Sequence, residues 1–278
     1  MKRVIVADSS SNVRTLPGVA YAFAPLTVRV DGVDYVDNES LDKQAFLDAL
    51  EKTKDASTTS CPNIQDWLHA FGDADEVFAV ALTSGLSGGY NAAVNAAEHY
   101  QKSNPGAKVF VLDSKSTGPE LELIIEKYAQ LIEENLSFEH IVSAIQEYWK
   151  RTHLMFALRK VDNFAKNGRV NPLVAKLASA LNIRIVGQAS DQGELQVLHK
   201  SRGEKNALNQ ILANMVECGF AGGRTILRHT QNLAAAQKLE ALIKERFPEC
   251  HITIGENEGL CSYYAEPGGL LVGFEAGA

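Results

Sequence analysis

The sequence predicts an α/β protein of two lobes: an N-terminal three-layer α/β/α domain with a mainly parallel sheet, and a smaller C-terminal α/β domain with a mixed sheet. Short apolar runs alternate with helix-forming segments through the first half of the chain, as in a parallel sheet covered on both faces. The second half combines a hairpin pattern with crossover units. A chain of 278 residues can form two medium domains, and we place them at residues 1–155 and 156–278.

The N-terminal half alternates strands with helices. We expect strands at Val4–Ala7, Leu26–Val30, Val33–Val36, Val77–Leu82 and Val109–Leu112. We expect helices at 42–54 (with Ser40 as N-cap), 64–71, 91–101, 120–134 and 138–151, and a polar loop at 55–63. Polar loops at Asp8–Ser11, Thr83–Gly89 and Asp113–Gly118 follow three of the strands. Because ligands bind at the carboxyl ends of parallel strands, these loops should converge on one rim.

The C-terminal half begins with an expected strand at Leu154–Leu158. Two further runs, Ile183–Gln188 and Glu194–His199, are separated by Ser-Asp-Gln-Gly and predict a hairpin. After it we expect helices at Glu204–Glu217 and Leu233–Arg246, and strands at Thr225–His229, His251–Ile254 and Leu270–Phe274.

Composition and charge exclude several classes of function. A formal charge of −7 and a pI near 5.6 argue against non-specific nucleic-acid binding and against docking on anionic membranes. No apolar run approaches the length of a membrane span, and no signal-peptide pattern opens the sequence, so we expect a cytoplasmic protein with no integral membrane segment. The four cysteines are scattered, which predicts neither a metal site nor a disulfide framework.

Residues 77–90 contain the strongest local signal for a binding site. An apolar run ends in a Ser/Gly loop, and helix-forming sequence follows at once. A helix start leaves N–H groups unpaired and carries partial positive charge. Gly85 and Gly88 let the backbone approach closely, while Ser84 and Ser87 add hydroxyl donors. The loop therefore suits an anion such as a carboxylate, a phosphate or an oxyanion, although a helix cap without a ligand would give the same pattern.

The same loop also matches the Gly-x-Ser-x-Gly elbow of serine hydrolases at residues 85–89. A hydrolase built on Ser87 needs an acid and a histidine base. Asp113 is a candidate acid, and the candidate bases are His199, His229 and His251. A serine esterase is therefore the alternative function, and a protein-interaction module without an apolar tunnel is a third.

A second polar segment, Thr59-Ser60-Cys61-Pro62, precedes the expected helix at 64–71. Proline fixes the turn and favours an extended Cys61, so the hydroxyls of Thr59 and Ser60 can project toward the rim. A helix-capping loop is the structural alternative for this segment.

Taken together, these motifs resemble the DegV family of bacterial fatty-acid-binding proteins over nearly the whole chain. Residues 4–11 are similar to its apolar run ending in Asp-Ser-Thr, and residues 59–62 to its Thr-Ser-Gln-Pro signature, with Cys61 replacing glutamine. Residues 83–90 resemble its Ser-Ser-Gly-Leu-Ser-Gly-Thr-Tyr signature. Residues 167–170 match its Gly-Gly-Arg-Ile element, and Arg202 falls at its basic segment.

The resemblance implies a carrier without catalytic residues or cofactor, in which two lobes clamp one long-chain fatty acid. Carried over, Thr59 and Ser87 would hold the carboxylate with help from the backbone at Gly88, and the acyl tail would fill an apolar tunnel. Some members present the acid to a fatty acid kinase that makes acyl-phosphate. Arg169 and Arg202 would then lie near the mouth and favour the phosphate product or the kinase.

One departure from the family concerns the head-group end. The family's His-Thr-Gly-Pro-Gly segment is replaced here by Tyr264-Ala265-Glu266-Pro267-Gly268. Tyr264 can donate a hydrogen bond but is not a cation near neutral pH, and Glu266 would disfavour an incoming anion. The sequence leaves open which side chains line the tunnel, among them Phe71, Leu86, Phe164, Leu173 and Leu177.

Overall fold

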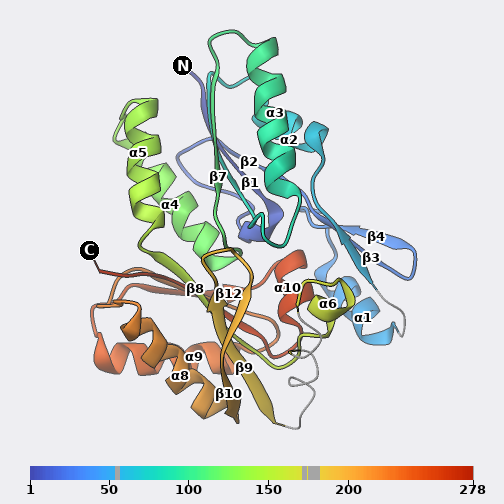
Figure 1. The fold of residues 1–278 in the computed structure, drawn as a ribbon, viewed down its shortest axis with the longest axis vertical. Helices are drawn as coiled ribbons and strands as arrows, with labels where there is room; N and C mark the ends of the chain where they lie inside the picture. Colours follow the sequence, from blue (N-terminus) through green and yellow to red (C-terminus); the bar gives the residue numbers. More distant parts are fainter. Residues whose placement is uncertain (54–56, 171–173, 175–181, 278) are drawn as a thin grey trace.

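The computed structural model describes residues 1–53, 57–170, 174 and 182–277. Its strands are β1 (Arg3–Asp8), β2 (Tyr21–Ala24), β3 (Thr27–Val30), β4 (Val33–Val36), β5 (Thr58–Ser60), β6 (Glu76–Ala81), β7 (Lys108–Asp113), β8 (Thr152–Leu158), β9 (Ile183–Ala189), β10 (Leu195–Arg202), β11 (Thr225–His229), β12 (Ile252–Glu256) and β13 (Leu270–Glu275). Its helices are α1 (Lys43–Lys52), α2 (Ile64–Phe71), α3 (Gly89–Ser103), α4 (Pro119–Glu133), α5 (Phe138–Trp149), α6 (Asp162–Lys166), α8 (Glu204–Glu217), α9 (Leu233–Arg246) and α10 (Gly259–Ala265). Figure 1 shows their arrangement.

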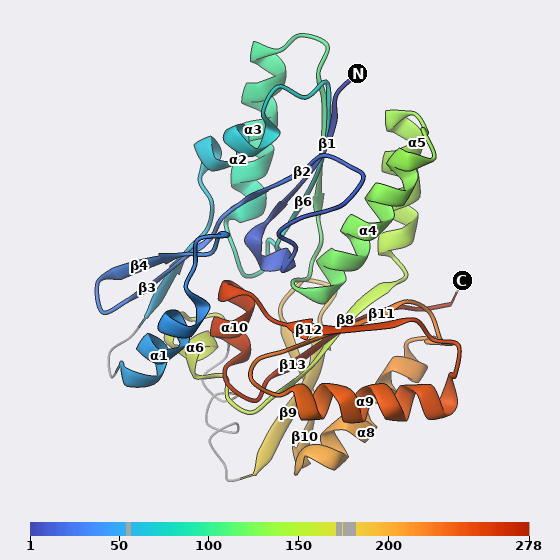
Figure 2. The ribbon, with the colours of Figure 1, turned by 180° about the vertical axis from the view of Figure 1, so that it is seen from behind.

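The N-terminal sheet is parallel throughout and has the strand order β2-β1-β6-β7. Alternate residues of each strand point to opposite faces. Val4 and Val6 therefore pack with α2 and α3, while Ile5 and Phe78 pack with α4 and α5. The two helix pairs cover opposite faces of the strands (Figures 1 and 2). The expected three-layer α/β/α arrangement is confirmed.

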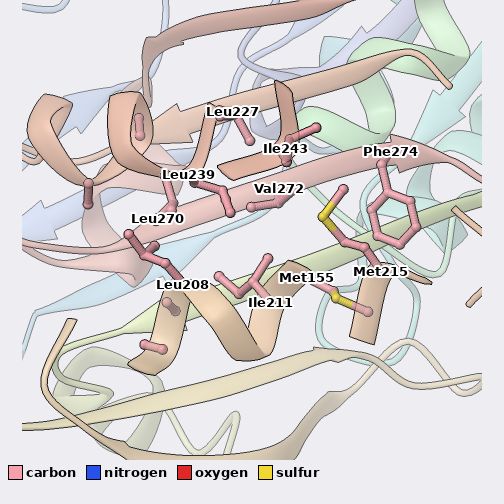
Figure 3. Close-up of a cluster of buried hydrophobic side chains, with 14 of the residues drawn as sticks. Met155, Leu208, Ile211, Met215, Leu227, Leu239, Ile243, Leu270, Val272 and Phe274 are labelled. Carbon is pink, nitrogen blue, oxygen red and sulfur yellow. The ribbon is translucent and has the colours of Figure 1, made fainter. Parts of the chain in front are cut away.

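The C-terminal sheet is mixed, as expected, and has the order β10-β9-β8-β13-β11-β12. Only β11 and β12 pair in parallel; the other described neighbours are antiparallel. Helices α8 and α9 cover one face, and their apolar side chains form a core with Met155, Val272 and Phe274 of the strands (Figure 3). Strand β8 begins at Thr152 and pairs within this sheet; the division into domains at residue 155 stays a prediction.

A small antiparallel sheet, β4-β3-β5, extends from the N-terminal lobe beside α1 (Figure 1). Its β3–β4 hairpin agrees with the sequence prediction, but β5 lies where we expected only a loop. Asp42, not Ser40, caps α1, because its carboxylate accepts the Ala45 N–H at 2.9 Å. Elements β2, α6 and α10 were also missed, since their short patterns are held by contacts from distant segments.

Helix α4 joins the two main sheets. Its Glu122 accepts from the Arg228 guanidinium of β11, with 2.6 Å between Nε and Oε1. One turn later, Glu126 accepts two bonds from Arg224, at 2.8 and 3.0 Å. Paired forks of this kind give geometric specificity as well as energy. The two Arg–Glu pairs therefore fix the orientation of α4 on the C-terminal sheet.

Candidate functional site

The three polar loops predicted to converge do so at the carboxyl ends of β1, β6 and β7. The Asp8 carboxylate, which is fully buried, accepts the Leu82 N–H at 2.5 Å. The Gly118 N–H donates to Ser10 O at 2.9 Å, and the Thr83 N–H donates to Ser116 O at 3.0 Å. Burial raises the pKa of Asp8 to about 6, against the opposing effect of its hydrogen bonds. The loops thus form one rigid rim.

A cavity of about 290 Å³ lies between this rim, strands β8 and β9 of the C-terminal sheet, and helix α10. The volume lies near the lower end of the range for ligand pockets. Its wall is mostly apolar; the apolar residues are Leu26, Leu82, Leu86, Leu154, Phe156, Leu158, Phe164, Ala189, Leu195, Leu260, Ala265 and Leu271. The open question of tunnel lining is thereby partly answered: Leu86 and Phe164 line the cavity, whereas Phe71 lies in the core beside α2. Leu173 and Leu177 lie outside the described residues.

Hydroxyl groups gather at one end of the cavity. Thr59 of β5, Ser87 of the Ser/Gly loop and Tyr264 of α10 all line it, and Thr59 Oγ1 lies 2.9 Å from the Tyr264 hydroxyl. Burial raises the pKa of Tyr264, so its phenol remains a donor. Ser87 Oγ accepts the Gly89 N–H at 3.2 Å, at the first turn of α3. This end therefore offers neutral donors beside a helix N-terminus.

Arg169 and Cys61 also border this end of the cavity. The exposed Arg169 side chain is held by two backbone carbonyls: Nε donates to Leu86 O at 3.0 Å, and Nη1 donates to Asn167 O at 2.6 Å. Cys61 packs beside Gly88, where an added Cβ would lie 3.5 Å from its sulfur. Ser60 and Gly88 are lining residues as well.

Three of the sequence-predicted residues lie outside the cavity wall. Ser84 Oγ accepts from Lys115 Nζ at 2.8 Å. Gly85 faces the β9–β10 hairpin, where an added Cβ would lie 2.5 Å from Gln192 O. Arg202 ends β10, seven residues beyond the lining residue Leu195, which is about 23 Å along an extended strand. These three residues therefore do not share a site with Thr59 and Ser87.

The expectation that Glu266 opposes an incoming anion is not supported by its position. Glu266 is buried and is not part of the described cavity wall. Its Oε1 accepts the Asn163 N–H at 3.1 Å, in the first turn of α6. Burial raises the pKa of its carboxyl, and the hydrogen bond opposes this shift. Glu266 therefore serves to hold α6 in place.

The esterase alternative requires an imidazole beside Ser87. His229 Nδ1 accepts the Asn232 N–H at 3.3 Å, and His199 Nε2 lies 3.4 Å from Asn214 Oδ1. Asp113 is paired with Lys115 at 2.7 Å. No histidine belongs to the cavity wall within the described parts of the chain. The geometry thus gives Ser87 no proton acceptor of the kind that a hydrolase uses.

Two further searches cover the described residues. They contain no cluster of three or more His, Cys, Asp or Glu side chains able to hold a metal ion. Among the described helices, none is long and apolar enough to cross a bilayer.

Comparisons with known proteins agree with these motifs. A family model described as "Uncharacterised protein, DegV family" matches residues 2–276. A DegV domain-containing protein of Streptococcus pneumoniae R6 is 42% identical over 275 residues, which cover 98% of each chain. The crystal structure of the S. pneumoniae fatty acid kinase B3 protein, loaded with linoleic acid, matches with a TM-score of 0.98 and 40% identity over 100% of both chains. A DegV family protein from Eubacterium eligens, loaded with heptadecanoic acid, has a TM-score of 0.96 and 41% identity, covering 99% of this chain and 100% of its own. The chain belongs to the DegV family.

Proposed function

We propose that this protein binds one long-chain fatty acid, with the carboxylate at Thr59 and Ser87 and the acyl tail in the cavity between the two sheets. The observation that carries the proposal is an apolar cavity that ends in hydroxyl donors at the start of α3. The fatty acids bound by the relatives from S. pneumoniae and E. eligens support it.

The two ends of such a ligand match the two ends of the cavity. A carboxylate accepts several hydrogen bonds, and charge-assisted bonds are stronger than neutral ones. Thr59, Ser87 and Tyr264 supply hydroxyl donors, and the first turn of α3 supplies partial positive charge. Each buried CH₂ of the tail contributes about 0.8 kcal/mol. The tail thus supplies most of the affinity, and the hydroxyls fix its orientation.

Replacing both carboxylate ligands tests the assignment. Thr59→Val keeps the shape of the side chain in β5, and Ser87→Ala removes one hydroxyl. We expect each to weaken palmitate binding about tenfold to a hundredfold, because each removes one hydrogen bond to a charged group. Isothermal titration of delipidated protein measures this. Ser84→Ala is the matched control, since Ser84 is in the same loop as Ser87 but outside the described cavity wall. A double variant with wild-type affinity would remove Thr59 and Ser87 from the carboxylate site.

We also propose that the bound acid is presented to a fatty acid kinase. The name of the pneumococcal relative supports this role, and Arg169 offers a cation at the cavity end where a phosphate would form. Acyl-phosphate should appear when the loaded protein is mixed with ATP and the catalytic subunit of such a kinase, and not when this protein is omitted. Failure to form acyl-phosphate, with fatty acid still bound, would leave a carrier that serves another acceptor.

A further inference from the structure

The cavity wall around Ser116 carries polar groups that the carboxylate site does not use. Ser116 and Thr117 lie in the loop between β7 and α4 and line the cavity together with Cys261 of α10. The backbone of this loop is well satisfied: Ser116 N–H donates to Ser114 Oγ at 3.1 Å, and Ser116 O accepts the Thr83 N–H at 3.0 Å. The side chains of the loop therefore hold fixed places in the wall.

The Ser116 hydroxyl is an exception in this loop. The residue is 3% exposed, and its Oγ has no hydrogen-bond partner in the described part of the protein. It is close enough to the Glu120 carboxyl to favour the ionised form, but outside hydrogen-bond geometry. The neighbouring Thr117 Oγ1 makes a long contact, 3.8 Å, with Cys261 Sγ. A buried hydroxyl without a partner loses its hydration and gains nothing in return.

Its location separates Ser116 from the other buried polar atoms that lack a partner. In the described residues these are Trp67 Nε1 and Tyr128 OH. Trp67 and Tyr128 pack in the cores between the parallel sheet and its helices, on opposite faces. Ser116 alone of the three lines the cavity. It is therefore the one that a ligand can reach.

Strand β8 shows how far Ser116 lies from the head-group end. At one end, Leu158 leads into α6, whose Phe164 ring packs 4.6 Å from the ring of Tyr264. At the other, Leu154 pairs with Gly273, where an added Cβ would lie 2.5 Å from Pro119, three residues after Ser116. Leu154 and Leu158 are about 13 Å apart at the rise of a strand. The Ser116 wall thus faces the middle of a bound acyl chain.

We propose that the cavity selects a long-chain fatty acid with a hydroxyl group near the middle of its chain, and that Ser116 is the specificity-determining residue. This inference rests on the proposed fatty-acid binding. A hydroxyl both donates and accepts, so the ligand oxygen satisfies Ser116 Oγ, with Thr117 beside it. A plain hydrocarbon at the same wall leaves Ser116 unpaired.

Competition between matched ligands tests the inference. Affinities of the delipidated full chain for stearate, 12-hydroxystearate and 3-hydroxystearate are measured by displacement of a fluorescent fatty acid. Wild-type protein should prefer 12-hydroxystearate over stearate. Ser116→Ala should reduce that preference about tenfold, because one hydrogen bond is lost with the 12-hydroxy ligand and none with stearate. The 3-hydroxy isomer, whose hydroxyl lies near the carboxylate, should show no such change.

Two controls keep the outcomes distinct. Ser60→Ala makes the same truncation at the other end of the cavity and should leave the ratio of the two affinities unchanged. Thr117→Val removes the second hydroxyl of the wall and should lower the preference less than Ser116→Ala. An unchanged ratio in Ser116→Ala, with both ligands bound, overturns the inference and leaves the proposed function intact. Absence of binding by stearate and 12-hydroxystearate to wild-type protein overturns both.

Discussion

Replacing Arg228 with alanine is expected to destabilise the protein by about 3–5 kcal/mol, because it leaves a buried carboxylate without its partner. Glu122, at 5% exposure, faces the Arg228 guanidinium through two charge-assisted bonds. Burial raises the pKa of Glu122, and the guanidinium opposes that shift. Without Arg228 the carboxyl must either take up a proton or remain charged in a poorly solvated place. The contact between α4 and the C-terminal sheet weakens in both cases.

Urea unfolding at pH 7 measures this loss, and Arg224→Ala is the matched control. Arg224 makes the equivalent pair one turn along α4, but its partner Glu126 is 45% exposed. Water can solvate Glu126 once Arg224 is gone, so the control should lose only about 1 kcal/mol. The double variant Glu122→Met/Arg228→Met should recover most of the loss, because apolar side chains can replace a buried ion pair. Equal losses in the two single variants would show that burial of Glu122 does not set the cost.

Gly193→Ala is expected to cost about 2–4 kcal/mol and to release bound fatty acid faster. Gly193 has φ +77°, a conformation that costs a side-chain-bearing residue about 1–2 kcal/mol. An added Cβ would also lie 1.9 Å from Thr83 Oγ1, which overpacks the contact by about 1–3 kcal/mol. Thr83 Oγ1 donates to Gly193 O at 2.9 Å, so the same change pushes the β9–β10 hairpin off the Ser/Gly loop.

Denaturant unfolding and the dissociation rate of a fluorescent fatty acid report the two effects separately. Gly32→Ala separates strain from overpacking, since Gly32 has φ +81° in the β3–β4 turn and open space around its Cα. It should cost only the backbone term and leave the dissociation rate unchanged. Thr83→Ala combined with Gly193→Ala should regain part of the lost stability. If Gly193→Ala and Gly32→Ala behave alike, the hairpin is not held by close contact with Thr83.

Local patterns were sufficient for much of the fold. Helices α2, α8 and α9 match their predicted ranges because an amphipathic face and end signals lie within each segment. Strand β5 has only three residues and owes its conformation to pairing with β3, about thirty residues earlier. Helix α10 is short, and its first N–H groups donate to the Asp37 carboxylate, 222 residues away from Gly259. No window of sequence contains such partners.

The candidate site divides in the same way. The two signature motifs predicted that Thr59 and Ser87 share a site, and the structure places both in the wall of one cavity. The motifs could not separate Ser87 from Ser84, because only the three-dimensional course of the loop turns one inward and the other toward Lys115. Ser116 was part of a loop expected at the rim. Its unpaired hydroxyl becomes visible only when every neighbour is in place.

The central position of β13 has a consequence for how the protein is made. In the six-stranded sheet, β13 lies between β8 and β11, although it comes after both in the chain. Ribosomes add about 5–20 residues per second, so β8 waits several seconds for the strand that covers its edge. During that interval its edge and the apolar face beside it remain open to aggregation. Cargo loading, which needs Leu271 of β13 in the cavity wall, is therefore a step that follows translation of residue 275.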